Sequence, residues 1–328
     1  MSALAPTLQA FFTDRLAQRQ ASPHTIAAYR DALRLLIVYA AGQLGSEPCD
    51  LDIADLDAPM VGAFLDHLER ERHNSARTRN ARLAAIHSLF RFAALRHPEH
   101  AAVIQRVLAI PPKRADRPLI SYLTEREISA LLNAPDRDTW TGRRDHALLT
   151  LATHTGLRAS ELTGLNIGDL HLGAPAHVGC RGKGRKERIT PLTKATATVL
   201  RVWLSERAGG PTGPLFPTRQ GARLSRDALE RRLAKHTATA TTHAPTLADK
   251  KVTLHVLRHS AAMRLLHAGV DLTVIALWLG HERTDTTQIY LHADLAIKQR
   301  ALERTAPPGR PPGRYRPPDS TLAFLENL

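Results

Sequence analysis

Apolar residues in the first part of the chain recur every three or four positions, which is the spacing of one face of a helix. Ser22 and Pro23 supply an N-cap followed by a proline at the first helical position. Asp57 can cap a second helix, and a third helix is predicted from about Ser75 to Leu95. The apolar stripe of the first of these helices is Ile26, Tyr29, Leu33, Leu36 and Ala40. The pattern predicts a small all-helical domain over residues 1–110.

The sequence IPPKRADRP interrupts this pattern and predicts a linker over residues 111–118, because consecutive prolines end a helix and the remaining residues are polar. A T-x-x-E capping box at Thr124 then opens a second domain over residues 119–305. Most of this domain has helical spacing. The exception is a pair of strand candidates, His177–Cys180 and Glu187–Thr190, which flank the basic turn RGKGRK and predict a β-hairpin.

Two stretches break the helical pattern. Residues 236–251, HTATATTHAPTLADKK, are polar and are predicted to form an exposed loop. Residues 306–328 are rich in proline and arginine, which predicts an extended tail. The fold class expected from these patterns is mainly α with an α+β component: an all-helical N-terminal domain, then a mostly helical domain with a small β-hairpin or sheet.

The charge of the chain indicates a polyanionic partner. There are 45 lysines and arginines against 31 aspartates and glutamates, which gives a net charge of +14. Such an excess most often binds nucleic acid, although a generally basic surface or an anionic membrane would also account for it. No apolar run is long enough to predict a transmembrane helix. Cys49 and Cys180 have neither metal-ligand spacing nor a disulfide pattern, so we expect a cytoplasmic protein without a metal or cofactor.

Four segments carry residues with chemical potential. They are HTGLRASELTGL at 154–165, RGKGRKERITPL at 181–192, TLHVLRHSAAMRLLHAG at 253–269 and HERTDTTQIYLH at 281–292. Each has an ordinary interpretation when taken alone: a surface arginine, a basic turn, a capping histidine and a packed tyrosine. Together they supply two arginines, one lysine, two histidines and one tyrosine, namely Arg158, Arg258, Lys183, His255, His281 and Tyr290.

This combination suits attack on a phosphodiester. Guanidinium groups bind phosphate oxygens in pairs and stabilise the charge of the transition state. A tyrosine hydroxyl can form a covalent phosphoester, and lysine and histidine can move the protons. Fixed cations can replace the metal ions that other phosphoryl-transfer enzymes use.

The order of these residues resembles the tyrosine recombinases, the phage integrase family. TGLRASELTGL, GKGRKERITPL, HVLRHSAA and LGHERTDTTQIYLH are similar to the signature segments of that family and follow in the family's order. The nine-residue gap between His281 and Tyr290 also fits. The helical N-terminal domain resembles the core-binding domain of Xer-like, integron and transposon integrases. The resemblance covers about residues 6–304.

The resemblance implies a role for each member of the set. Arg158 and Arg258 would hold the scissile phosphate, and the two histidines would support it and assist proton transfer. Lys183 would protonate the leaving 5′ oxygen, and Tyr290 would attack and become joined to the 3′ phosphate. Glu161 would support the turn of the first arginine.

The family also implies a substrate and an assembly. The substrate would be double-stranded DNA with an inverted-repeat core site, bound between the two domains. Four protomers would act on two duplexes, alone or with a sister recombinase, in DNA integration, excision or transposition, without metal or ATP. The helix after the nucleophile would dock on a neighbouring protomer, and the tail could add a second contact.

Further basic residues are candidates for DNA contacts. Some open the third helix and others lie in the basic turn; they are Arg77, Arg79, Arg82, Arg185 and Lys186. A solvated helical face is the alternative for the first three. Three other functions remain open at this stage: a DNA-binding regulator without catalysis, a monomeric tyrosine topoisomerase, and a metal-dependent nuclease, for which the sequence offers no acidic cluster.

Overall fold

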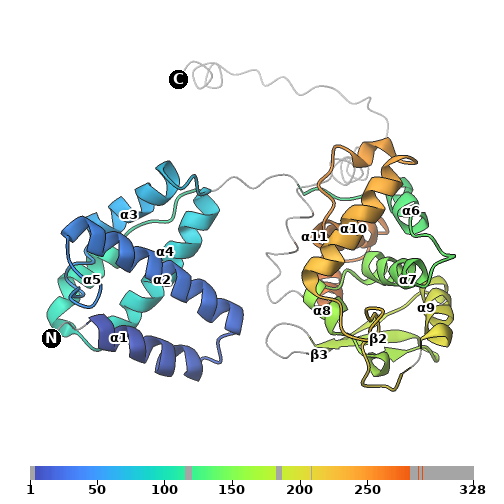
Figure 1. Cartoon of the computed structure of the whole chain (residues 1–328), viewed down its shortest axis with the longest axis horizontal. Coiled ribbons are helices and arrows are strands. Elements are labelled where there is room, and N and C mark those ends of the chain that lie inside the picture. The colour runs from blue at the N-terminus through green and yellow to red at the C-terminus, as the bar shows by residue number, and fades with distance from the viewer. Residues whose placement is uncertain are drawn as a thin grey trace, which may run out of the picture. The chain divides into compact units, whose positions relative to one another are not determined.

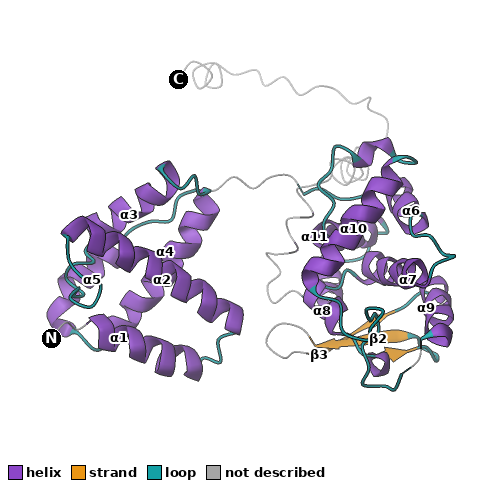
Figure 2. Ribbon diagram, viewed as in Figure 1, coloured by secondary structure: helices purple, strands orange, loops and turns teal. Residues whose placement is uncertain are grey.

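The computed structural model describes residues 4–114, 120–181, 187–207 and 209–280, together with Thr287 and Tyr290. Its contacts divide the chain into two compact units, residues 1–117 and 118–328. Both units consist mainly of helices, and the strands belong to the second (Figures 1 and 2). The mainly helical fold class with a small sheet, predicted from the sequence, is confirmed.

The first unit is all helical over its described residues. Its elements are α1 (Leu4–Ala10), η1 (Phe11–Leu16), α2 (Pro23–Leu44), α3 (Ala58–Arg70), α4 (Ala76–Ala93), η2 (Pro98–His100) and α5 (Ala101–Leu108). The predicted caps at Ser22 and Asp57 form, because both side chains accept hydrogen bonds from backbone N–H groups three residues later. Ser75 caps α4 in the same way. Helices α2, α3, α4 and α5 pack on one apolar core, with Leu36, Leu65 and Ile86 at its centre.

The chain that leaves this unit is bound to α4. Arg79 Nη1 donates to the Pro111 carbonyl at 3.2 Å. The side-chain amide of Asn80 binds the backbone of Lys113 at both of its polar groups. Its Nδ2 donates to the Lys113 carbonyl at 2.7 Å, and its Oδ1 accepts from the Lys113 N–H at 3.0 Å. Lys113 Nζ also pairs with Glu69 at 2.5 Å. The first residues of the predicted linker are therefore part of the first unit.

The second unit surrounds a separate core. Its elements are α6 (Glu125–Asn133), α7 (Trp140–Thr155), α8 (Ala159–Gly164), η3 (Ile167–Asp169), β1 (Leu170–His171), β2 (His177–Arg181), β3 (Glu187–Pro191), α9 (Lys194–Glu206), α10 (Arg226–Thr241), η5 (Pro245–Leu247), α11 (Leu254–His267) and α12 (Leu272–Leu279). The capping box at Thr124 is present. Helix α7 is central, since it contacts α6, α9 and α11.

The strands form one small antiparallel sheet in the order β1-β2-β3 (Figure 2). The predicted hairpin is confirmed in its two strands, which pair His177 with Pro191 and Arg181 with Glu187. The two-residue strand β1 was not predicted. It is too short to leave an alternating pattern in the sequence and exists only because it pairs with β2.

The expectation of a loop over residues 236–251 is wrong in its first part. Helix α10 continues to Thr241, and only the segment after it is irregular, with one short 3-10 turn. The alternating threonines and alanines hide a buried face, because alanine is a good helix former and adds little apolar signal. The buried positions are His236, Ala240, Ala244 and Leu247.

His236 is buried because it completes a charged cluster between α7 and α10. Its Nε2 lies 2.9 Å from Asp145 Oδ2, and Arg232 Nη1 reaches the same oxygen at 3.2 Å. Arg144 is fully buried and donates Nε and Nη2 to Asp145 Oδ1 at 2.9 and 2.7 Å. Three side chains thus share one buried carboxylate, which fixes α10 on α7.

Candidate active site

Two of the candidate arginines meet at a pair of tight turns. Helix α7 ends at Gly156 and helix α12 ends at Gly280, and both glycines are left-handed with φ of 64° and 65°. Such a conformation is easy only for glycine. A side chain at Gly156 would also lie 2.8 Å from Leu279, so the two turns approach each other closely.

The arginines bind the carbonyl oxygens of these turns. Arg258, one turn into α11, donates Nη1 to Gly156 and Nη2 to Leu279, both at 2.7 Å. Arg158, at the start of α8, donates Nη2 to Gly280 at 3.0 Å. These contacts join distant parts of the chain. Arg258 and Gly156 are 102 residues apart in the sequence, and Arg158 and Gly280 are 122 residues apart.

The two arginines differ in exposure. Arg258 is buried, and burial together with the nearby Arg158 lowers its pKa to about 10. The side chain of Arg158 keeps 34% of its surface exposed. The Arg258 guanidinium is therefore still charged at neutral pH, and the Arg158 side chain can be reached from solvent.

Glu161 holds Arg158 in place, which is the supporting role that the family resemblance implied. Its Oε2 accepts from the Arg158 N–H at 2.7 Å and its Oε1 from Arg158 Nη1 at 2.9 Å. A second arginine, Arg188 of β3, donates to both oxygens. Burial opposes ionisation of Glu161, but the hydrogen bonds from Arg188 and from the Arg158 backbone outweigh it and lower the pKa. The carboxylate is ionised at neutral pH.

The candidate nucleophile is buried. Tyr290 has 1% of its surface exposed and packs with Met263, Ile275 and Leu279. Its hydroxyl lies 3.0 Å from Nδ1 of His259, the residue that follows Arg258. Burial raises the pKa of Tyr290 to about 12, against a small opposite effect of Arg258. In this state the phenol is protonated and shielded from solvent.

His259 contacts Tyr290, and a second histidine of α11 packs against His259. The rings of His255 and His259 are in edge contact, with centroids 4.1 Å apart. Burial, His255 and Arg258 lower the pKa of His259 to about 4. Desolvation and the two candidate arginines also lower the pKa of His255. Both imidazoles are therefore neutral at pH 7 and able to accept a proton.

Several candidates lie outside the described residues, namely Lys183, Arg185, Lys186 and His281. The remaining DNA-contact candidates belong to α4. Arg77 is exposed, whereas Arg79 is only 6% exposed and serves the Pro111 carbonyl. Arg82 is half-buried, and burial and Arg72 lower its pKa.

Two residues of the site escaped the sequence analysis. His259 was not among the candidates, because only His255 and Arg258 were taken from its segment. Arg188 lay in the basic segment but was not distinguished from its neighbours. The hairpin pattern could have placed Arg188 opposite Cys180, because residues at equal distances from the turn pair across the two strands. It could not have shown the ion pair with Glu161, which lies outside the hairpin.

Comparison with known proteins covers nearly the whole chain. The model of the phage integrase family matches residues 121–296, and that of the phage integrase N-terminal SAM-like domain matches residues 8–97. The "Putative integrase/recombinase y4rC" of Sinorhizobium fredii is 54% identical over 328 residues, covering 100% of this chain and 99% of the relative. The tyrosine recombinase XerC of Pelobacter propionicus is 33% identical over 95% of this chain and 99% of its own.

Solved structures have the same fold. The XerH site-specific recombinase bound to a palindromic difH substrate aligns with a TM-score of 0.64 at 22% identity, over 88% of this chain and 80% of its own. The Tn1549 transposon integrase in complex with a circular intermediate DNA aligns with a TM-score of 0.67 at 17% identity, over 91% and 99%. Over the helices that the structure describes, none has the length and apolarity needed to cross a bilayer. The chain belongs to the phage integrase family, the tyrosine site-specific recombinases.

Proposed function

We propose that the protein cuts and rejoins duplex DNA at a specific site through a 3′-phosphotyrosyl intermediate formed by Tyr290. The observation that carries this proposal is that Arg158 and Arg258 bind adjacent turn carbonyls. The residue after Arg258 is His259, which contacts the Tyr290 hydroxyl. Two fixed guanidinium groups can bind the oxygens of a phosphodiester and stabilise its charge while a phenol attacks the phosphorus.

The first step forms one bond and breaks one. Tyr290 Oη attacks the scissile phosphorus while Arg158 and Arg258 bind its non-bridging oxygens. The phenol proton passes to His255, whose lowered pKa leaves it neutral. The 5′ oxygen leaves with a proton from Lys183. Rejoining reverses these transfers with a different 5′ hydroxyl as nucleophile. The phosphotyrosyl bond conserves the energy of the phosphodiester, so the reaction is isoenergetic.

The buried tyrosine gives the proposal a second part. Tyr290 is 1% exposed and its hydroxyl contacts His259, so a phosphate in solution does not reach it in this state. Tyr290 must therefore move from the interior before it attacks, and binding of the DNA site supplies the differential interaction that favours this movement. Cleavage would then be confined to protein that already holds its site.

The partners follow from the same reaction. We propose that the protein binds an inverted-repeat DNA site and acts in the cytoplasm as a tetramer on two duplexes, alone or with a sister recombinase. DNA integration, excision or transposition would be its biological setting. Support comes from the net charge of +14 and from the related proteins, which include a transposon integrase and Xer recombinases.

Covalent capture tests the proposal. Wild-type protein and Tyr290→Phe are each incubated with total DNA of the source organism. The mixture is then denatured, and the DNA that remains attached to protein is sequenced. We expect adducts only with the wild type, concentrated at one short inverted repeat. Loss of the hydroxyl alone should leave DNA binding intact. Adducts in Tyr290→Phe, or none with wild type when binding persists, would contradict the assignment.

A further inference from the structure

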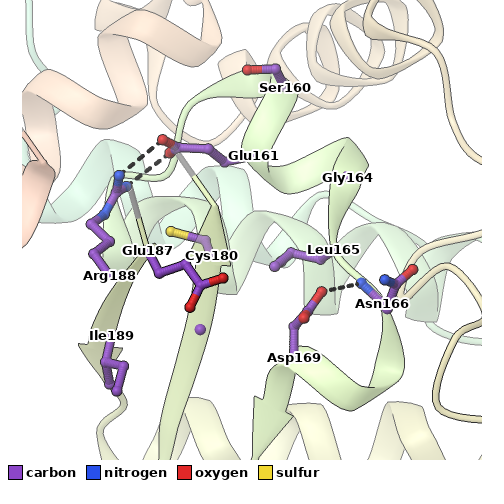
Figure 3. A pocket seen from close by; sticks show the side chains of 11 residues that line it. Ser160, Glu161, Gly164, Leu165, Asn166, Asp169, Cys180, Glu187, Arg188 and Ile189 are labelled. Carbon is purple, nitrogen blue, oxygen red and sulfur yellow. Dashed lines mark hydrogen bonds and ion pairs between the residues drawn. The ribbon is translucent and has the colours of Figure 1, made fainter. Parts of the chain in front are cut away.

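Arg188 forms a two-point ion pair at the site, although it is outside the proposed catalytic set. It lies on β3, and its side chain is only 12% exposed. Its Nη1 and Nη2 donate to Glu161 Oε1 and Oε2 at 2.9 and 2.8 Å (Figure 3). Parallel hydrogen bonds of this kind combine charge with a fixed orientation. Strand β3 is thereby held to helix α8.

This pair changes the charge that Arg158 presents. Glu161 and Arg158 alone would form a neutral pair, because the carboxylate already accepts Arg158 Nη1. Arg188 supplies a second positive charge to the same carboxylate, so the three side chains together carry one net positive charge. Since Arg158 is the more exposed of the two arginines, that charge remains available to a phosphate.

Arg188 also lies against the second glycine turn. A side-chain carbon at Gly280 would fall 2.6 Å from Arg188 Nη1 and 3.1 Å from its Cδ. The carbonyl of Gly280 accepts from Arg158, and His281 follows directly. One side chain thus contacts the segment that contains Glu161 and the segment that leads to His281.

Its place on the sheet connects it to a third segment. Arg188 pairs with Cys180 across β2 and β3, and residues 182–186, which include Lys183, join these strands. A cavity of about 540 Å³ lies beside the pair, between α8, η3 and the strands (Figure 3). Because open space borders Arg188 and Glu161 on that side, the ion pair rather than close packing ties the hairpin to α8 there.

We propose that Arg188 is a positioning residue that aligns the Lys183 hairpin with Arg158 and with the turn before His281. It acts through Glu161 and Gly280 and does not touch the DNA. This inference rests on the proposed function, in which Lys183 donates the proton to the leaving 5′ oxygen. Loss of Arg188 should therefore weaken the acid step more than it weakens DNA binding.

A leaving group that needs no acid separates this role from a structural one. The duplex recovered by covalent capture is prepared in two forms, with a normal 5′ oxygen and with a 5′ bridging sulfur at the scissile position. We expect Arg188→Gln to cleave the oxygen duplex about 10²-fold more slowly than wild type, the size of a lost general-acid contribution. The sulfur duplex should lose less than about a tenth of that factor. Arg188→Lys, which keeps the charge but not the paired donors, should fall between.

A matched control is Arg223→Gln. Arg223 donates to carbonyls at the other end of α8, Gly164 among them, and has no contact with Glu161 among the described interactions. We expect the same oxygen-to-sulfur rate ratio as wild type. Tryptophan fluorescence during urea unfolding verifies that each variant is folded, and gel shift verifies binding.

The outcomes are distinct. Selective loss on the oxygen duplex supports the inference. Wild-type rates in Arg188→Gln, or equal losses on both duplexes in folded Arg188→Gln and Arg188→Lys, overturn it. A wild-type protein that forms no adduct with either duplex contradicts the proposed function itself, and so is told apart from a failure that concerns Arg188 alone.

Discussion

The neighbour of the nucleophile, His259, makes a quantitative prediction about pH. Its pKa falls from 6.5 to about 4 because of burial, His255 and Arg258. As the pH falls, His259 therefore binds a proton in the unfolded chain at a higher pH than in the folded chain. The stabilisation that depends on the neutral ring is complete above pH 6.5 and is lost as the pH falls through 4. The full loss corresponds to about 3 kcal/mol, and the part between pH 7.5 and pH 5.0 to about 2 kcal/mol.

The test compares wild type with His259→Asn. The amide oxygen of asparagine can accept the Tyr290 hydroxyl in place of Nδ1 but does not titrate. Urea unfolding is followed by tryptophan fluorescence, which reports on the second unit alone because Trp140, Trp203 and Trp278 all lie there. From pH 7.5 to 5.0, we expect wild type to lose about 2 kcal/mol more of its unfolding free energy than His259→Asn does.

A control on the same helix is His267→Gln, which changes an exposed histidine near the end of α11. It should follow the wild-type pH dependence. If wild type and His259→Asn lose stability in parallel, within about 0.5 kcal/mol, the ring is not held neutral. The interpretation of His259 as an acceptor for the Tyr290 hydroxyl would then fail.

Three further predictions concern the second unit. Lys183→Ala should slow cleavage about 10²-fold, with recovery on the sulfur duplex; absence of recovery would exclude Lys183 as the general acid. Asp145→Asn should lower the unfolding free energy by about 3 kcal/mol in the same urea assay, because Arg144 is fully buried and loses its counter-charge; an unchanged midpoint would refute that. Gly156→Ala should cost about 1–2 kcal/mol and reduce adduct formation, because it strains a left-handed turn whose carbonyl holds Arg258; full activity would contradict this.

Local signals predicted several of the helices. The caps at Ser22, Asp57 and Thr124 form as expected because an N-cap acts on backbone groups within three residues. The left-handed turns at Gly156 and Gly280 also rest on the local sequence, because glycine adopts this conformation without strain. Each of these features depends on neighbours in the sequence, so each can be inferred without knowing the fold.

The errors arise where distant residues decide the structure. The helix over residues 236–241 was predicted as loop because its buried face depends on a contact between His236 and Asp145, 91 positions away. Arg79 was counted with exposed candidates, yet it is buried because the chain returns past it at Pro111. Helical spacing alone could not single out His259, because its significance comes from a tyrosine 31 residues later.

The binding of both arginines to main-chain oxygens has a consequence for how the site can change. Every residue has a carbonyl, so replacing the Leu279 side chain removes no acceptor, whereas Gly156 and Gly280 must stay glycine because their turns are left-handed and tightly packed. Inserting or deleting a single residue at the end of α7 or α12 would instead turn the acceptors by about 100°. The alignment of the two guanidinium groups therefore depends on the lengths of α7 and α12. Site variants are best sought by exchanging residues rather than by altering the length of either helix.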